Sequence, residues 1–152
     1  MSLFSGSSGN NRSSRLYKAL VETELAAEVS GTVTPTIDPY LYNISATVRA
    51  GRTPQEVEEA LDVELQRIVD EPVTDEELTK AIKQVRAQFA YSAESVTNQA
   101  YWLGFSEVVA DHEWFETFLD HLAQVTAEDV QRLAAKMLTR RNRVTGIYIP
   151  QG

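Results

Sequence analysis

The chain has 152 residues, of which 43% are hydrophobic and 24% charged, as in an ordinary globular domain that builds its own core. It contains no cysteine, so disulfides and thiolate chemistry are excluded. The net charge of −8 argues against a nucleic-acid surface, which needs clustered Lys and Arg. No apolar run approaches the roughly 20 residues of a membrane span, and no targeting segment is apparent. The composition predicts a soluble acidic domain and leaves its compartment open.

The first eleven residues differ in composition from the rest. Met1-Ser2-Leu3 is typical of a cloning remnant, and residues 5–14 are rich in Ser, Gly and Asn, which favours a mobile loop. Gly6 and Gly9 lack the spacing and the following Lys of a phosphate-binding loop. We therefore expect residues 1–11 to form a flexible tail with a Gly/Ser loop, and residues 12–152 to form a single domain.

Two patterns after this loop predict a helix and a hairpin. Apolar residues recur at helical spacing over residues 14–25. They then alternate with polar residues over 29–37 and again over 40–48, which is typical of half-buried strands. Asp38-Pro39 separates the two runs as a turn, so the runs predict an antiparallel hairpin.

The remainder predicts five helices and a closing strand. Three helix starts carry a capping signal: Thr53-Pro54-Gln55-Glu56, Thr74-Asp75-Glu76-Glu77 and, less closely, Thr126-Ala127-Glu128-Asp129. Apolar residues behind each cap repeat at three-to-four spacing, which indicates one buried face. Two further helices are expected over 101–109 and 114–122, with Asp111 as a candidate cap. The β-branched run over 143–149, which ends at Pro150, predicts a strand.

Strands and helices are thus segregated along the chain rather than alternating. Such segregation is the α+β pattern. We therefore predict an antiparallel-rich sheet with helices packed on one side.

No pattern in the chain predicts a metal or catalytic site. His112 and His121 are its two histidines, and a separation of nine residues turns them to opposite sides of a helix. Neither H-E-x-x-H nor H-x-x-E-H occurs, and no serine lies in G-x-S-x-G. The carboxylates of Glu58-Glu59 and Glu76-Glu77 diverge by about 100° on a helix, which favours solvated faces. We predict no catalytic residue and no metal ligand here.

Arg140, Arg141 and Arg143 form the one basic cluster of the sequence. It follows the helix expected to end near Leu138, where cations complement the carbonyl end of the helix. We expect this role rather than nucleic-acid binding, because the chain as a whole is acidic.

Four segments, in order, resemble the insulinase/pitrilysin family of zinc metallopeptidases, whose domains share a processing-peptidase-like metallohydrolase fold. Phe4-Ser5-Gly6-Ser7-Ser8 and Ser14-Arg15-Leu16-Tyr17-Lys18-Ala19-Leu20-Val21-Glu22 are similar to the family's Gly/Ser loop and its "S-R-L-Y-x-x-L-x-E" helix. Thr74-Asp75-Glu76-Glu77-Leu78 resembles "T-x-x-E-L-x-x-A-K", and residues 122–130 resemble "L-x-x-I-T-x-E-D-V". The ending Ile149-Pro150 is the fourth match, so the resemblance covers about residues 4–150.

The resemblance implies that zinc and the general base belong to another domain. In the family, H-x-x-E-H of the first domain supplies both, and this sequence lacks it. A later domain supplies an Arg and, seven residues on, a Tyr that hold substrate near the zinc, and these positions are occupied here by the non-matching Val21 and Glu28. Valine cannot donate to a substrate carbonyl, and a carboxylate repels a developing oxyanion. The resemblance therefore implies the C-terminal, non-catalytic domain that packs behind the catalytic one.

The resemblance also implies partners. The family domain carries a strand and a helix ahead of the Gly/Ser loop, so we expect a partial domain with an open sheet edge. Expected partners are its own catalytic domain and a second family subunit, peptide substrate in the assembled parent, and another copy through the open edge, with neither nucleic acid nor membrane. The parent is expected to be a zinc metalloendopeptidase, and this chain, inactive alone, forms chamber wall and packing surface.

Two other functions stay open at this point. The chain could belong to a catalytically inactive family member that acts as a structural subunit, and H-x-x-E-H elsewhere in the parent would favour the enzyme instead. It could instead be an unrelated helical interaction domain, which would need an exposed apolar groove. Substrate specificity and oligomeric state are not predicted.

Overall fold

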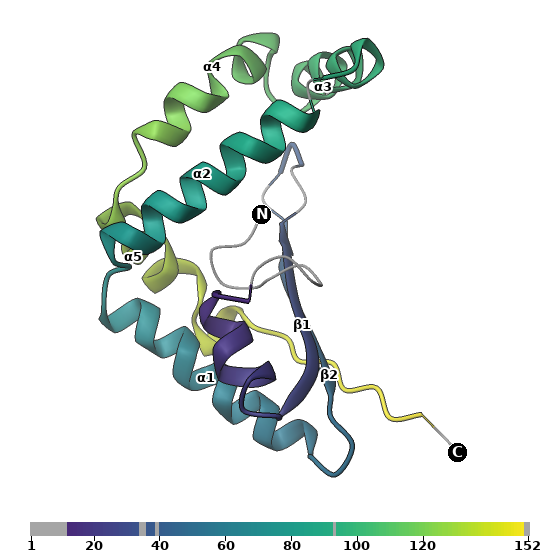
Figure 1. Ribbon diagram of the computed structural model, residues 1–152, viewed down its shortest axis with the longest axis vertical. Helices are drawn as coiled ribbons and strands as arrows, with labels where there is room; N and C mark the ends of the chain where they lie inside the picture. Colours follow the sequence, from purple (N-terminus) through teal and green to yellow (C-terminus); the bar gives the residue numbers. More distant parts are fainter. Residues whose placement is uncertain (1–11, 34–35, 39, 93, 151–152) are drawn as a thin grey trace.

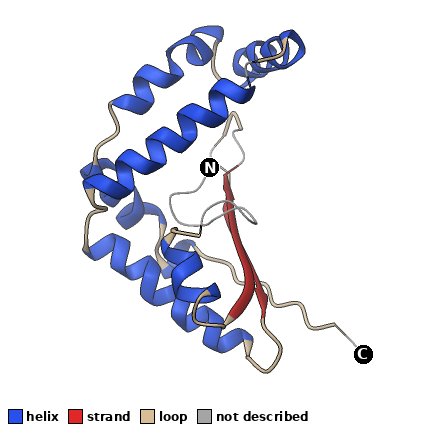
Figure 2. Ribbon diagram, viewed as in Figure 1, coloured by secondary structure: helices blue, strands red, loops and turns tan. Residues whose placement is uncertain are grey.

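The structure is a computed structural model that describes residues 12–33, 36–38, 40–92 and 94–150. Helices line one side of the molecule and a single hairpin lies on the other (Figures 1 and 2). In chain order the elements are η1 (Tyr17–Val21), β1 (Ala26–Val33), β2 (Tyr42–Val48), α1 (Pro54–Asp70), α2 (Asp75–Ser92), α3 (Val96–Val109), α4 (His112–Ala123), α5 (Ala127–Met137) and η2 (Arg140–Asn142). This arrangement confirms the α+β prediction. The predicted tail and Gly/Ser loop over 1–11 lie outside the described residues.

The first predicted helix forms as a short π-helix, η1. Ser14 caps its start, because the Oγ of Ser14 accepts a hydrogen bond from the N–H of Tyr17 at 3.3 Å. Leu16 and Leu20, one turn apart, are fully buried. Glu24 then adopts a φ of 62°, in the left-handed region, and turns the chain into β1.

β1 and β2 form the antiparallel hairpin that the alternating pattern predicts. The register runs from Ala26 opposite Val48 to Val33 opposite Tyr42, with an irregularity between Ala26 and Glu28. Along β2, half-buried residues alternate with exposed ones. One face of the hairpin therefore packs on η1 and α1 while the other faces solvent.

The turn of the hairpin is longer than predicted. The ladder stops short of Ile37 and Tyr40, whose side chains are 71% and 64% exposed. The alternation of apolar and polar residues continues through Ile37 and Tyr40, but no packed layer covers these side chains. The sequence pattern therefore overestimates the length of the strands. Of the Asp38-Pro39 turn only the first residue is described, and it lies in a bend.

All three predicted capping boxes form. At the start of α1, Thr53 Oγ1 accepts from the N–H of Glu56 at 3.3 Å, while the Glu56 carboxylate accepts from the N–H of Thr53 at 2.8 Å. The same reciprocal bonds start α2, from Thr74 and Glu77, and α5, from Thr126 and Asp129. Each box supplies acceptors for two N–H groups that have no acceptor within the helix. Such a cap stabilises a helix by about 1 kcal/mol.

The two remaining helices also have side-chain caps. Asp111 caps α4 as predicted, since its Oδ1 accepts from the N–H of Trp114 at 2.8 Å. α3 begins at Val96, five residues earlier than predicted, because Ser95 Oγ accepts from the N–H of Asn98 at 3.1 Å. The apolar pattern alone did not show this cap.

Most of the buried apolar residues form two clusters in the part of the molecule that we call the body: η1, β1, β2, α1, residues 73–86 and α5. The hairpin cluster consists of Leu16, Leu20, Ala26, Val29 and Val57. The second cluster joins α1 to α5 and consists of Ile68, Val73 and Ala134. Beyond the body, α3 and α4 pack on each other, and α4 also contacts α2 (Figure 1). We call residues 87–123 the lobe.

The predicted closing strand is wrong. Residues 143–150 are irregular, and no described strand pairs with them. Val144 is 95% exposed and Tyr148 is 88% exposed. β-branched and aromatic residues favour strands where a pleated, half-buried surface covers them, and no described element covers these. Figure 1 shows the segment running to the C-terminus, at the end of the molecule opposite α3.

The helices were also compared with the dimensions of a bilayer. Across the described ranges, none combines the length and the apolar composition that crossing a membrane requires.

Candidate functional site

The two family positions singled out from the sequence are placed on adjacent elements. Val21 ends η1, is half-buried and packs against the hairpin cluster. Glu28 lies in β1 opposite Thr47 and is exposed. Val21 therefore supports the core, and its side chain has no polar group to offer a ligand. A role for either residue toward substrate stays a prediction.

The two histidines lie on one helix, α4, at its first residue and in its last turn. His112 Nδ1 is 3.5 Å from Glu107 Oε2, with both side chains about two-thirds exposed. His121 is exposed as well. No group of three or more His, Cys, Asp or Glu residues in the described part of the chain could hold a metal ion. These residues therefore do not fit a zinc ion.

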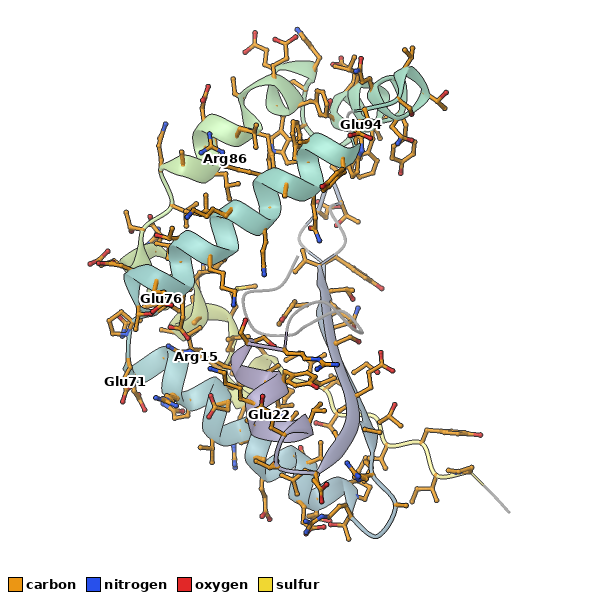
Figure 3. All side chains as sticks on the ribbon, in the orientation of Figure 1. Arg15, Glu22, Glu71, Glu76, Arg86 and Glu94 are labelled. Atoms are coloured by element: carbon orange, nitrogen blue, oxygen red, sulfur yellow. The ribbon has the colours of Figure 1, made fainter. Side chains whose placement is uncertain are left out.

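One ion pair joins two of the segments that carry the family resemblance. Arg15 Nε and Nη2 donate to the two carboxylate oxygens of Glu77, each at 2.8 Å. The Arg15 side chain is 14% exposed and that of Glu77 is 37% exposed. In Figure 3, Arg15 points toward the junction of α1 and α2. A bidentate arginine–carboxylate pair fixes direction as well as distance, so this bond sets the start of α2 against η1.

The same bond controls the charge of Glu77. Hydrogen bonding by Arg15, with further bonds from Thr74, lowers the pKa of Glu77 from 4.5 to about 2. The carboxylate therefore stays ionised at any physiological pH. It serves at once as the second half of a capping box and as the partner of Arg15. Sequence reasoning identified only the cap, because two residues 62 positions apart give no local signal of contact.

A second set of ion pairs holds the C-terminal segment to α1. Arg143 donates to Glu58 Oε1 at 3.1 Å and also pairs with Asp62. Arg140 Nη2 donates to Asp62 Oδ2 at 3.0 Å, and Thr145 Oγ1 donates to Glu58 Oε1 at 3.1 Å. Two arginines of the cluster, Arg140 and Arg143, thus bind carboxylates of α1, rather than only complementing the end of α5 as predicted. The guanidinium of Arg143 lowers the pKa of Asp62.

A hollow lies along one face of α2. It is open, has a volume of about 690 Å³, and is lined by Asp75, Glu76, Thr79, Lys80, Lys83, Gln84 and Ala87. Lys80 Nζ also contacts Ser13 Oγ, which places Ser13 beside the hollow. Carboxylates and ammonium groups are mixed here, and the lining has no histidine or cysteine. Such a surface can hydrogen-bond a polar chain, but it has no nucleophile with an adjacent base.

Comparison with known families identifies the class of domain. The sequence profile described as the Peptidase M16 inactive domain matches residues 1–85, more than half of the 152-residue chain. The chain therefore belongs to this family. A search of curated proteins finds no match.

Solved structures agree with that assignment. A protein described as a zinc protease, from Bordetella pertussis Tohama I, is 28% identical with a TM-score of 0.86, over 98% of this chain and 80% of that one. The inactive peptidase domain of a protein described likewise, from Bordetella parapertussis, is 29% identical with a TM-score of 0.85, over 93% of this chain and 76% of that one. A protease from Helicobacter pylori, 18% identical, shares the fold with a TM-score of 0.78 over 88% of this chain and 32% of that one. The chain is thus an inactive-type C-terminal domain of zinc-protease-like architecture.

Proposed function

We propose that this chain is the non-catalytic domain of a zinc-dependent peptidase whose zinc and general base lie in another domain. The observation that carries the proposal is the match to the inactive-domain profile over residues 1–85. Among the described residues no cluster could hold zinc, so the proposal places the metal in another domain. The zinc of the parent would supply an activated water, and no residue described above takes part in that step.

The domain would act as chamber wall and packing surface. The Arg15–Glu77 pair fixes α2 against η1, and the Arg143 bonds fix the C-terminal segment against α1. Because η1 packs on the hairpin, the Arg15–Glu77 bond also fixes the position of α2 relative to the hairpin. A peptide inside such a chamber would meet exposed Lys, Thr and carboxylate groups rather than a reactive centre.

The proposal assigns Val21 and Glu28 to a domain that does not touch the scissile bond. In an assembled enzyme, Val21→Ala and Glu28→Gln should leave kcat/KM within about threefold of wild type. A loss of about tenfold in a variant that still folds would mean that about 1.4 kcal/mol of transition-state stabilisation passes through this region. That result would assign the chain to the substrate-holding class instead.

The proposed partners are a catalytic domain of the same family and a second family subunit. β1 and β2 are the strands of the described sheet, and each has one edge without a described partner. Unpaired backbone groups at a sheet edge favour strand addition, from a neighbouring domain or from another copy. Sedimentation of the chain alone should therefore show species larger than a monomer.

The direct experiment is reconstitution. The full chain is co-purified with a family domain from the same organism that carries H-x-x-E-H, and turnover of a fluorogenic peptide is measured. We expect a stable complex whose activity needs the zinc-bearing domain and is lost when the glutamate of its H-x-x-E-H motif, the general base, is replaced. Activity that persists without that domain, or a zinc-bearing domain that neither binds this chain nor gains from it, would contradict the proposal. The second outcome would favour a domain of a catalytically inactive family member that acts as a structural subunit.

A further inference from the structure

The helix α3 is apolar on both of its sides. Only one of its fourteen residues, Glu107, is charged. At about 100° per residue, Trp102, Phe105, Ser106 and Val109 lie on one side, and these are the buried or half-buried residues. A helix that is hydrophobic all round is normally covered all round. Among the described residues, the main packing partner of α3 is α4.

Next to this side of α3 runs an exposed stripe of Thr97, Tyr101, Gly104 and Val108, spaced by three or four residues, in which the ring of Tyr101 stacks on that of Phe105 at a centroid distance of 5.9 Å. Tyr101 is 61% exposed and Val108 is 67% exposed. They are seven residues apart, two helical turns, so their side chains lie on the same line. We call these four residues the α3 stripe. A solvated helix face would carry charged residues here, and this one carries none.

Gly104, near the centre of the stripe, strengthens this observation. A Cβ built on it meets no atom within 4 Å, and its backbone is not in the left-handed region. Glycine inside a helix costs about 1 kcal/mol relative to alanine. Neither conformation nor packing within the described residues explains that cost. The lack of a side chain at this position of the stripe is explained if another molecule approaches the helix closely here.

The charge of the lobe indicates what kind of molecule that is. Residues 87–123 contain no Lys or Arg and six carboxylates: Glu94, Glu107, Asp111, Glu113, Glu116 and Asp120. All six are exposed. A second α3 stripe would bring two such acidic lobes together, and anionic lipid would also be repelled. We propose that the α3 stripe is a docking surface for a protein segment that presents apolar side chains flanked by Lys or Arg.

This inference is independent of the proposed function, because it needs neither zinc nor a catalytic domain. The α3 stripe would provide affinity through its apolar side chains, and the acidic charge of the lobe would select the partner, a division that is common in protein interfaces. The surface is also distant from the buried core, since α3 packs on α4 at the far end from the hairpin cluster (Figure 1).

The test uses the full chain and a short synthetic amphipathic helix of Leu and Lys. Trp102 and Trp114 are the two tryptophans of the chain and both lie in the lobe, so their emission reports binding there. We expect saturable binding that is weaker at high salt and a blue shift of the emission. The Leu/Glu counterpart of the peptide should not bind.

Four double variants separate the stripe from general attraction. Tyr101→Ser with Val108→Ser should weaken binding about tenfold, whereas Val144→Ser with Ile149→Ser, which removes exposed apolar groups elsewhere, should change it less than twofold. Glu94→Gln with Glu107→Gln should weaken it about fivefold, and Glu22→Gln with Glu59→Gln, the charge-matched control, should not. Circular dichroism checks that each variant keeps its helices.

Three results would overturn the proposal. The first is binding that survives the loss of Tyr101 and Val108, because attraction would then be electrostatic only. The second is self-association of the chain that those substitutions abolish, which makes the occupant a second copy. The third is that the chain binds phosphatidylcholine vesicles and does not bind the basic peptide.

Discussion

The body and the lobe are held together by different means. All ten of the buried hydrophobic residues of the described chain lie outside the lobe, and in residues 87–123 Ser106 is the one described side chain that is buried. The lobe instead contains half-buried aromatic rings: Phe89 lies 5.0 Å from Phe115 and 5.3 Å from Phe118, centroid to centroid. A fully buried leucine contributes several kcal/mol, whereas an aromatic pair adds about 0.5–1.5.

This difference indicates two roles. A body that buries its leucines and adds long-range ion pairs is a self-sufficient scaffold. A lobe that covers only one side of its helices leaves apolar surface for another molecule, which is the usual reason that such surface stays exposed. The predictions below test this contrast, from the largest expected effect to the smallest.

The largest effect is expected from truncating a leucine in the body. Leu20→Ala should destabilise the chain by about 2–5 kcal/mol, because Leu20 is fully buried in the hairpin cluster. Leu119→Ala, the same change at a half-buried position of α4, should cost less than half as much. Urea unfolding of both variants measures the contrast. Equal losses would mean that the lobe is as tightly packed as the body.

The next effect concerns the ion pair between η1 and α2. Arg15→Met should cost about 1–3 kcal/mol, because it leaves Glu77 without two charge-assisted hydrogen bonds in a partly buried setting. Arg67→Met breaks an exposed pair with Glu71 and should cost less than about 0.5 kcal/mol. A double-mutant cycle of Arg15→Met with Glu77→Gln isolates the coupling. A coupling energy near zero would show that this bond does not stabilise the folded chain.

Much of the fold could be predicted from local signals. Every capping box, the hairpin and the five helices follow from patterns within a few residues of each other, which is the range over which caps and periodicity act. The main failure concerns pairing between residues that are far apart in the sequence. Residues 143–149 have strand composition, but a strand exists only with a partner, and composition does not report a partner.

The candidate site was harder to predict for the same reason. Arg15 and Glu77 each belong to a motif that the sequence analysis noted, yet the bond between them depends on how η1 meets α2. Arg143 was assigned to the end of α5 because that helix is its neighbour in sequence, and its partners on α1 lie 81 and 85 positions away. The α3 stripe was visible only as an apolar helix, because exposure is a property of the packed structure.

The pH dependence of stability sharpens the role of Glu77. Its pKa in the folded chain is about 2, below the ordinary value of 4.5. A lowered carboxyl pKa contributes stability that is complete above about pH 4.5 and is lost as the pH falls toward 2. Glu77→Gln and Arg15→Met should both flatten the fall in melting temperature over this window. An unchanged profile in both variants would show that the pair does not shift the titration of Glu77.

The smallest effect is a gain. Gly104→Ala should raise the free energy of unfolding by about 0.5–1 kcal/mol, because the helix interior has open space for a methyl group. Thermal unfolding followed at 222 nm, roughly the far-ultraviolet helix band, measures it. A loss of stability would mean that Gly104 packs against part of the chain. Its explanation as a point of contact with a partner would then fail.

The central claim is that this domain contains no catalytic centre. The decisive measurement combines metal analysis of the purified full chain after dialysis with zinc and a fluorogenic peptide assay on the same sample. We predict less than one-tenth of a zinc ion per chain, on the order of background for weak surface sites, and no turnover above buffer. One tightly held zinc per chain, with peptide cleavage that a chelator abolishes, would contradict the assignment to the inactive domain.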